Sequence, residues 1–112
     1  MLELSNTDVT WDATYDGLAP RLSERAAAQL RADDATIAAL LVLLDDPERF
    51  VAAHVALTRV AALEYSAFPD WNGLHVDLGA DGRARIDPDQ RHPLAARWRA
   101  WYAISPRPRA LP

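Results

Sequence analysis

The sequence contains neither cysteine nor lysine, and each absence removes a class of chemistry. Without cysteine the chain forms no disulfide, no thiolate metal site and no cysteine nucleophile. Without lysine it forms no Schiff base and no P-loop phosphate site, and all twelve basic residues are arginine. A chain without cysteine is typical of the reducing cytosol, so we expect a cytoplasmic protein.

Long apolar segments are also lacking. The longest apolar run, residues 38–44, is far shorter than the roughly 18 residues that a membrane-spanning helix needs. The opening residues MLELSNTDVTW contain neither a basic leader nor an apolar stretch, which argues against a signal peptide. We expect a soluble single domain over residues 1–104 with no membrane contact, followed by a proline-rich tail over residues 105–112.

Charge is spread unevenly along the chain. Residues 1–82 carry five arginines and fourteen acidic residues, whereas residues 83–112 carry seven arginines and two acidic residues. The basic end could bind nucleic acid or another acidic partner, or it could attract the acidic part of the same fold. The net charge of −4 weakens long-range attraction to phosphate, so attraction within the fold is favoured and nucleic acid is an unlikely partner.

Local patterns predict an α+β fold, in which three or four helices pack with an antiparallel β-hairpin. Strict alternation over residues 9–15 predicts a strand that could join this hairpin. Helical spacing predicts a first helix over residues 20–32, a helical hairpin over residues 34–63 and a C-terminal helix over residues 93–103. The β-hairpin is expected over residues 73–87.

The turn of the predicted helical hairpin is Asp45-Asp46-Pro47-Glu48. Asp46 is expected to cap the second helix, with Pro47 at its first position. The helix before this turn has one clear apolar stripe, formed by Ile37, Leu40, Leu41 and Leu44. Val42 and Leu43 are apolar too, so we expect this helix to be buried on more than one side.

The segment IAALLVLLDDPERFVAAHVALTRVAAL, within residues 36–63, resembles one helical pair of the HEAT and armadillo repeats. The resemblance rests on a leucine-rich helix, an Asp-Asp-Pro turn and an alanine-rich second helix that includes Ala56-Leu57. Arg49 and Phe50 stand where a HEAT helix usually opens with Val then Arg, and no second copy follows. Because a lone repeat cannot bury its face, the resemblance implies a degenerate unit completed by other elements. An ordinary helical hairpin also accounts for these residues.

The alternation of apolar and polar residues fixes the register of the predicted β-hairpin. Apolar side chains share one face of both strands only if a three-residue loop, residues 80–82, joins them, with Gly82 in a left-handed position. This register makes three specific pairs: Leu78 with Ala84, Asp77 with Arg85, and His75 with Asp87.

A calcium loop is excluded in this segment. When the EF-hand pattern is aligned on Gly82, Gly79 and Pro88 occupy positions that require oxygen ligands. The three histidines have no metal-ligand spacing, and neither a nucleophile elbow nor a phosphate-binding loop occurs. We therefore assign no metal, no cofactor and no catalytic residue.

Two histidines still require an interpretation. His54 lies close to the apolar stripe of its helix, so we expect a hydrogen-bonded core histidine. His75 with Asp77 and Asp87 is the one acid–histidine cluster that the hairpin predicts. It could orient a general base, or it could be a solvated cross-strand pair.

The C-terminal helix offers the candidate interaction residues, namely Arg97, Trp98, Arg99 and Trp101. These side chains could bind a partner protein or nucleic acid, or the tryptophans could close the core. The sequence thus predicts a small non-enzymatic domain for protein interaction. Nucleic-acid binding through the arginine-rich end, and an enzyme that uses His75, Asp77 and Asp87, are the alternatives.

Overall fold

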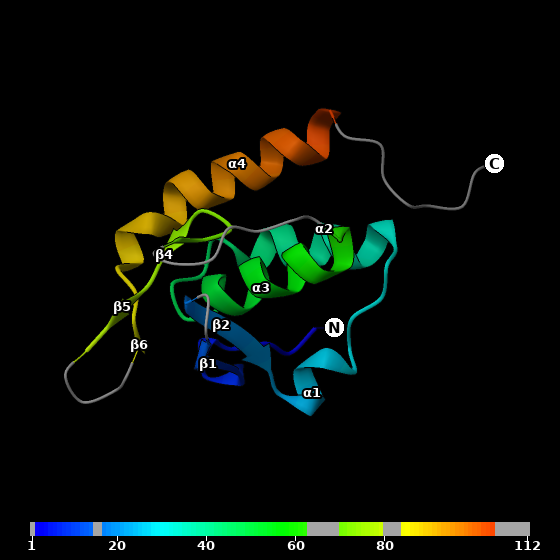
Figure 1. Ribbon diagram of the computed structural model, residues 1–112. Coiled ribbons are helices and arrows are strands. Elements are labelled where there is room, and N and C mark those ends of the chain that lie inside the picture. Colours follow the sequence, from blue (N-terminus) through cyan, green and yellow to red (C-terminus); the bar gives the residue numbers. More distant parts are fainter. Residues whose placement is uncertain (1, 15–16, 63–69, 80–83, 105–112) are drawn as a thin grey trace.

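The computed structural model describes residues 2–14, 17–62, 70–79 and 84–104 (Figure 1). Helices α2 (Asp34–Leu43) and α3 (Phe50–Ala61) lie side by side at the centre. Helix α4 (Arg91–Ile104) crosses above them in Figure 1, and strands β1 (Val9–Thr14) and β2 (Gly17–Leu22) lie below. The short helices are η1 (Asn6–Asp8), α1 (Glu24–Ala27) and η2 (Pro88–Gln90).

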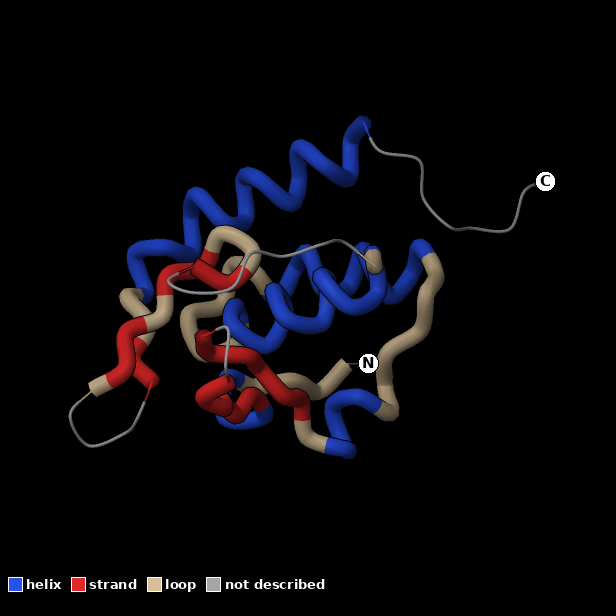
Figure 2. The backbone as a smooth tube through the Cα atoms, in the orientation of Figure 1, coloured by secondary structure: helices blue, strands red, loops and turns tan. Residues whose placement is uncertain are grey.

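Three antiparallel two-stranded sheets occur in the described part of the chain (Figure 2). Strands β1 and β2 form the first. Strands β3 (Asp70–Trp71) and β4 (Leu74–His75) form the second, and β5 (Asp77–Leu78) and β6 (Ala84–Arg85) form the third. Asn72 and Gly73 join β3 to β4 with φ of 48° and 88°, the left-handed values of the Asn-Gly turn that joins tight hairpins.

The core is centred on α3, in which every residue from Phe50 to Thr58 is buried. Helix α2 contributes the apolar stripe expected from the sequence, and α4 contributes Leu94, Ala95 and Trp98. The sheets add Val9, Leu22, Trp71 and Leu74. Burial of this apolar surface supplies most of the favourable free energy of folding. The predicted α+β class is confirmed.

Several predicted elements are present with small changes of boundary. The strand predicted over residues 9–15 is β1, although Tyr15 lies outside the described residues. The helical hairpin over 34–63 is α2 with α3, and the C-terminal helix begins two residues earlier than predicted. Pro93 stands in the first turn of α4, where its missing N–H costs no hydrogen bond. The tail, residues 105–112, lies outside the described residues.

The helix predicted over residues 20–32 is wrong. Residues 17–22 form β2, and the helix that follows, α1, is only four residues long with Ser23 as its N-cap. Pro20 stands opposite Trp11. Since the Ser23 N–H bonds to the Asp8 carbonyl, alternation makes Pro20 a non-hydrogen-bonded position, so its missing N–H faces away from β1.

The predicted cap of α3 is also wrong. Residues 47–49 form a turn whose Glu48 N–H bonds to the Asp46 carboxylate, and α3 begins only at Phe50.

The prediction that α2 is buried on more than one side fails at Val42, which is 67% exposed. Among the described residues, part of the apolar surface of α2 therefore remains exposed to solvent.

The register predicted for the β-hairpin is partly confirmed. Leu78 pairs with Ala84 and Asp77 with Arg85, while the loop around Gly82 lies outside the described residues. The predicted pairing of His75 with Asp87 is wrong, because His75 pairs with Asp70 across β3 and β4.

Candidate functional site

Among the described residues, the most buried polar side chain is His54, in the middle of α3. Its ring is fully buried between two tryptophans, with ring-centroid distances of 5.5 Å to Trp71 and 5.9 Å to Trp98. The Trp98 indole N–H donates to His54 Nδ1 over 2.9 Å. Because an indole only donates, Nδ1 accepts and the proton resides on Nε2, which lies 3.2 Å from the Trp71 carbonyl. Both ring nitrogens are satisfied, as expected for a core histidine.

The surroundings of His54 keep its ring neutral. Burial is the largest cause and lowers its pKa to about 4, and the positive charge of Arg97 lowers it further. The backbone contacts with Trp71 and Asn72 act in the opposite direction. A ring that titrates so far below neutral pH and contacts no solvent is a structural group, and we assign it no proton-transfer role.

A second chain of hydrogen bonds fixes the turn of the β3–β4 hairpin to α3 and α4. Thr58 donates to the His54 carbonyl over 2.9 Å and accepts from the Asn72 side chain over 2.7 Å. Arg97 donates to the carbonyl oxygen of Asn72 over 2.7 Å, and its guanidinium lies 5.8 Å from the Trp98 ring. A Cβ atom at Gly73 would overlap the Arg97 guanidinium, so this contact requires glycine.

The structure places the four predicted interaction residues mainly in contacts within the fold. Trp98 is 1% exposed and Trp101 is half-buried, with ring centroids 5.3 Å apart. Trp98 therefore closes the core and is unavailable to a partner. This agrees with the alternative interpretation of the tryptophans.

The arginines of α4 bind acidic and carbonyl groups of the same fold. Arg99 forms a two-pronged ion pair with Asp45, at 2.7 and 3.2 Å, and also donates to the Leu41 carbonyl. Arg91 donates to the Asp45 carbonyl over 2.7 Å. Two arginines of the basic C-terminal segment thus lie against the end of α2, and one of them pairs with an acidic residue there, as expected if the two parts attract each other.

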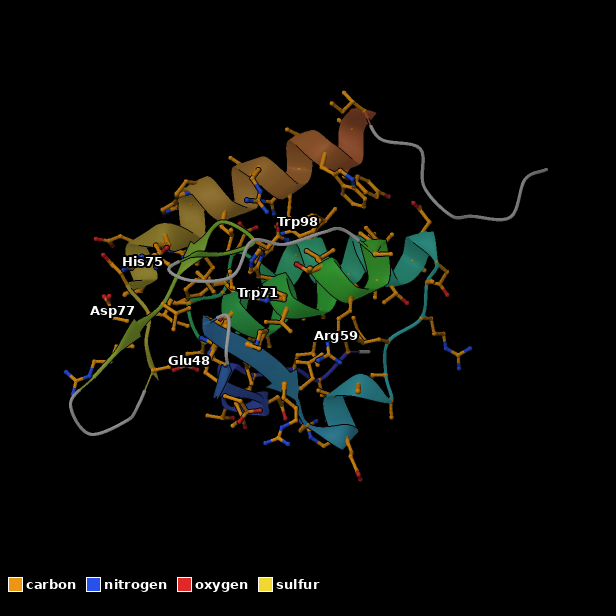
Figure 3. All side chains as sticks on the ribbon, in the orientation of Figure 1. Glu48, Arg59, Trp71, His75, Asp77 and Trp98 are labelled. Carbon is orange, nitrogen blue, oxygen red and sulfur yellow. The ribbon has the colours of Figure 1, made fainter. Side chains whose placement is uncertain are left out.

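The pair of His75 and Asp77 lies away from the tryptophan core (Figure 3). His75 Nε2 is 2.8 Å from Asp77 Oδ1, but the two side chains are 50% and 72% exposed. Asp87 does not join them, because it caps η2 by accepting from the Asp89 N–H. Its predicted place beside His75 is taken by Gln90, whose amide bonds to both the N–H and the carbonyl of His75. Both side chains of this pair are exposed, as in a solvated surface contact.

Asp8 is the buried carboxylate of the N-terminal segment. It is 8% exposed and accepts from the Ser5 N–H, the Ser23 hydroxyl and the Arg25 guanidinium at 2.8 to 2.9 Å. Burial alone would raise its pKa, but these hydrogen bonds and the Arg25 charge outweigh burial and hold the pKa below its ordinary value. The carboxylate joins η1 to α1, which is a structural role.

An open groove, apolar in its larger part, follows the exposed side of α2 and was not predicted from the sequence. One part, of about 900 Å³, is lined by Leu2, Ala39, Val42, Leu43, Asp45, Asp46, Pro47 and Arg49. A second part, of about 470 Å³, shares Leu2 and Ala39 and continues past Ala35 to Arg31 and Asp33. The sequence does contain a signal for this groove. Residues 35–44 include no charged residue, whereas a helix with a single buried stripe usually carries charged residues on its other side.

Other kinds of site find little support in the described residues. They contain no group of three or more acidic or histidine side chains that could hold a metal ion. None of their helices has the length and apolar character needed to cross a bilayer. A scan against protein-family models and searches of curated proteins and of solved structures found no match.

Proposed function

We propose that this chain is a small non-enzymatic domain for protein interaction, and that the outer side of α2 is its contact surface. One observation carries the proposal: Val42 is 67% exposed in a helix that has no charged side chain between residues 35 and 44. Apolar surface that remains in water after folding is a common property of protein-binding sites.

The resemblance of residues 36–63 to a HEAT-like helical pair supports the same surface. In a repeat array each pair buries its outer side against the next pair. Here α4 packs against α2, and β1 and β2 pack against α3, while Ala35, Ala38 and Val42 remain exposed. A partner helix could supply the missing neighbour.

The two alternatives have weaker support. Nucleic-acid binding through α4 would require free arginines, whereas Arg91, Arg97 and Arg99 donate to groups of the same fold. An enzyme that uses His75 and Asp77 would need a site shielded from water, and both side chains are at least half exposed.

Site-specific photocrosslinking tests the proposal. A photoreactive phenylalanine analogue is placed at Ala35 in cells that naturally produce the protein, and at Ala96, an exposed alanine of α4, as the control. We expect a covalent adduct of higher mass from position 35 and none from position 96. Adding Val42→Arg should abolish the adduct, since a buried apolar contact would then contain a charge.

The crosslink also has a clear negative outcome. If position 35 gives no adduct, or if Val42→Arg leaves the adduct unchanged, the α2 surface is not the interface. Because Val42 is 67% exposed, Val42→Arg should leave the isolated domain folded, and its circular dichroism and unfolding midpoint provide the check.

A further inference from the structure

The groove along α2 has a rim in which charges of opposite sign balance. Arg31 and Asp33 line the groove where α2 begins, and Asp45, Asp46 and Arg49 line it where α2 ends. Arg99 bonds to Asp45 at this second end. Three arginines thus offset three aspartates, so the rim selects neither a basic nor an acidic partner.

Helix α2 contributes several small side chains to the lining of the groove. Ala35, Ala39 and Val42 recur at i, i+4 and i+7 and therefore share one side of α2. Helices approach each other most closely where the contacting side chains are small. The surface is therefore suited to a second helix of the same kind, packed along its length.

We infer that the occupant is a second copy of this chain, with the two α2 helices antiparallel about a two-fold axis. The inference rests on the proposed function and names the partner. A two-fold axis between Ala38 and Ala39 places Ala35 of each copy beside Val42 of the other. In this arrangement the end of the groove that Arg31 and Asp33 line faces the end that Asp46 and Arg49 line in the other copy, so each of these arginines is directed toward an aspartate of the other copy.

Two other features agree with this arrangement. The dipoles of antiparallel helices oppose each other, which is the favourable arrangement. Asp33 also approaches Asp45 across the axis, but Asp45 already forms its ion pair with Arg99, and Asp33 caps α2 by accepting from the Thr36 N–H at 2.8 Å. Both carboxylates are compensated within their own copy.

Because the natural sequence contains no cysteine, introduced cysteines can form disulfides only with each other. The variants Ala35→Cys and Val42→Cys are purified separately and then oxidised alone or as an equimolar mixture. In the inferred register positions 35 and 42 of different copies are adjacent. Two copies of position 35 are seven residues apart along the helix, or about 10 Å, which exceeds the reach of a disulfide. The mixture should therefore form disulfide-linked dimers, and each variant alone should not.

Sedimentation equilibrium of the full chain provides the second measurement. The natural sequence should be dimeric at high micromolar concentrations, Val42→Arg should be monomeric, and Ala96→Arg should remain dimeric as the matched control. A natural chain that is monomeric throughout, or a cysteine mixture that crosslinks no faster than either variant alone, overturns the inference. If the photocrosslink at position 35 instead captures a different protein, self-association is wrong while the proposed function stands.

Discussion

The indole N–H of Trp98 donates to Nδ1 of His54 over 2.9 Å, and this bond joins α4 to the middle of α3. It exists only while the histidine is neutral, because a protonated ring would present a second donor to the indole. Because this bond holds α4 against α3, the packing of the C-terminal helix should depend on pH.

Stability should fall in mild acid. Burial lowers the folded pKa of His54 to about 4, whereas the unfolded value is near 6.5. As pH falls below 6.5, the unfolded chain takes up a proton that the folded chain refuses, and the loss levels off below pH 4. Between pH 7 and pH 5 the expected loss from this group is about 2 kcal/mol in the free energy of unfolding. Urea unfolding at several pH values measures it.

His54→Gln is the control for this titration. Glutamine offers an oxygen to the indole and an amide to the Trp71 carbonyl but does not titrate. The variant should be less stable at pH 7, because its side chain packs less well against the two tryptophans. Its stability should nevertheless change less between pH 7 and pH 5. An unchanged pH dependence would mean that another group is responsible.

Asn6 replaces the missing cap of α3. Arg49, the N-cap residue, makes no side-chain cap bond, whereas Asn6 Oδ1 accepts from the Val51 N–H over 2.9 Å and its amide donates to the Pro47 carbonyl over 3.0 Å. Asn6→Ala should lower the free energy of unfolding by about 1–2 kcal/mol. Asn6→Asp keeps the acceptor and adds a negative charge near a helix N-terminus, so it should cost less. Equal losses in thermal or urea unfolding would exclude a capping role.

Gly73 and Arg97 should be energetically coupled. Gly73 has φ of 88°, and a Cβ atom there would overlap the Arg97 guanidinium. Gly73→Ala should therefore destabilise the fold by about 1–2 kcal/mol or more, from backbone strain together with displacement of the arginine. In the double variant with Arg97→Ala the overlap disappears, so the combined loss should be smaller than the sum of the single losses. Strict additivity would show that Arg97 does not occupy this position in solution.

Elements with a strong local pattern could be predicted from the sequence. The alternation of residues 9–15 identified β1, and apolar spacing identified α2, α3 and most of α4. Strand β2 was missed because Leu22 and Ala26 have helical spacing, and a proline within a strand is allowed only once the partner strand is known. The pairing preference of a strand depends on tertiary context.

Contacts between side chains and distant backbone groups could not be predicted. The alternation of apolar and polar residues correctly predicted the pairing of Asp77 with Arg85. It also predicted Asp87 beside His75, where the structure instead has the side chain of Gln90. The cap from Asn6 to α3 spans 45 residues, so no local motif contains it. The burial of His54 was foreseen from its helix position, whereas its partner Trp98 came from a different helix.

Ala62 offers a site for stabilisation. It ends α3 with φ of 54° and ψ of 40°, a left-handed conformation that disfavours a Cβ atom, and it is exposed. Ala62→Gly should raise the free energy of unfolding by about 0.5–1 kcal/mol, because the relieved strain exceeds the entropy that glycine loses on folding. The neighbouring Ala61→Gly is the matched control: Ala61 lies within the helix, so the same substitution should lower stability by up to about 1 kcal/mol. Urea unfolding at neutral pH compares the two variants. Changes of the same sign would show that Ala62 does not have a left-handed conformation in solution.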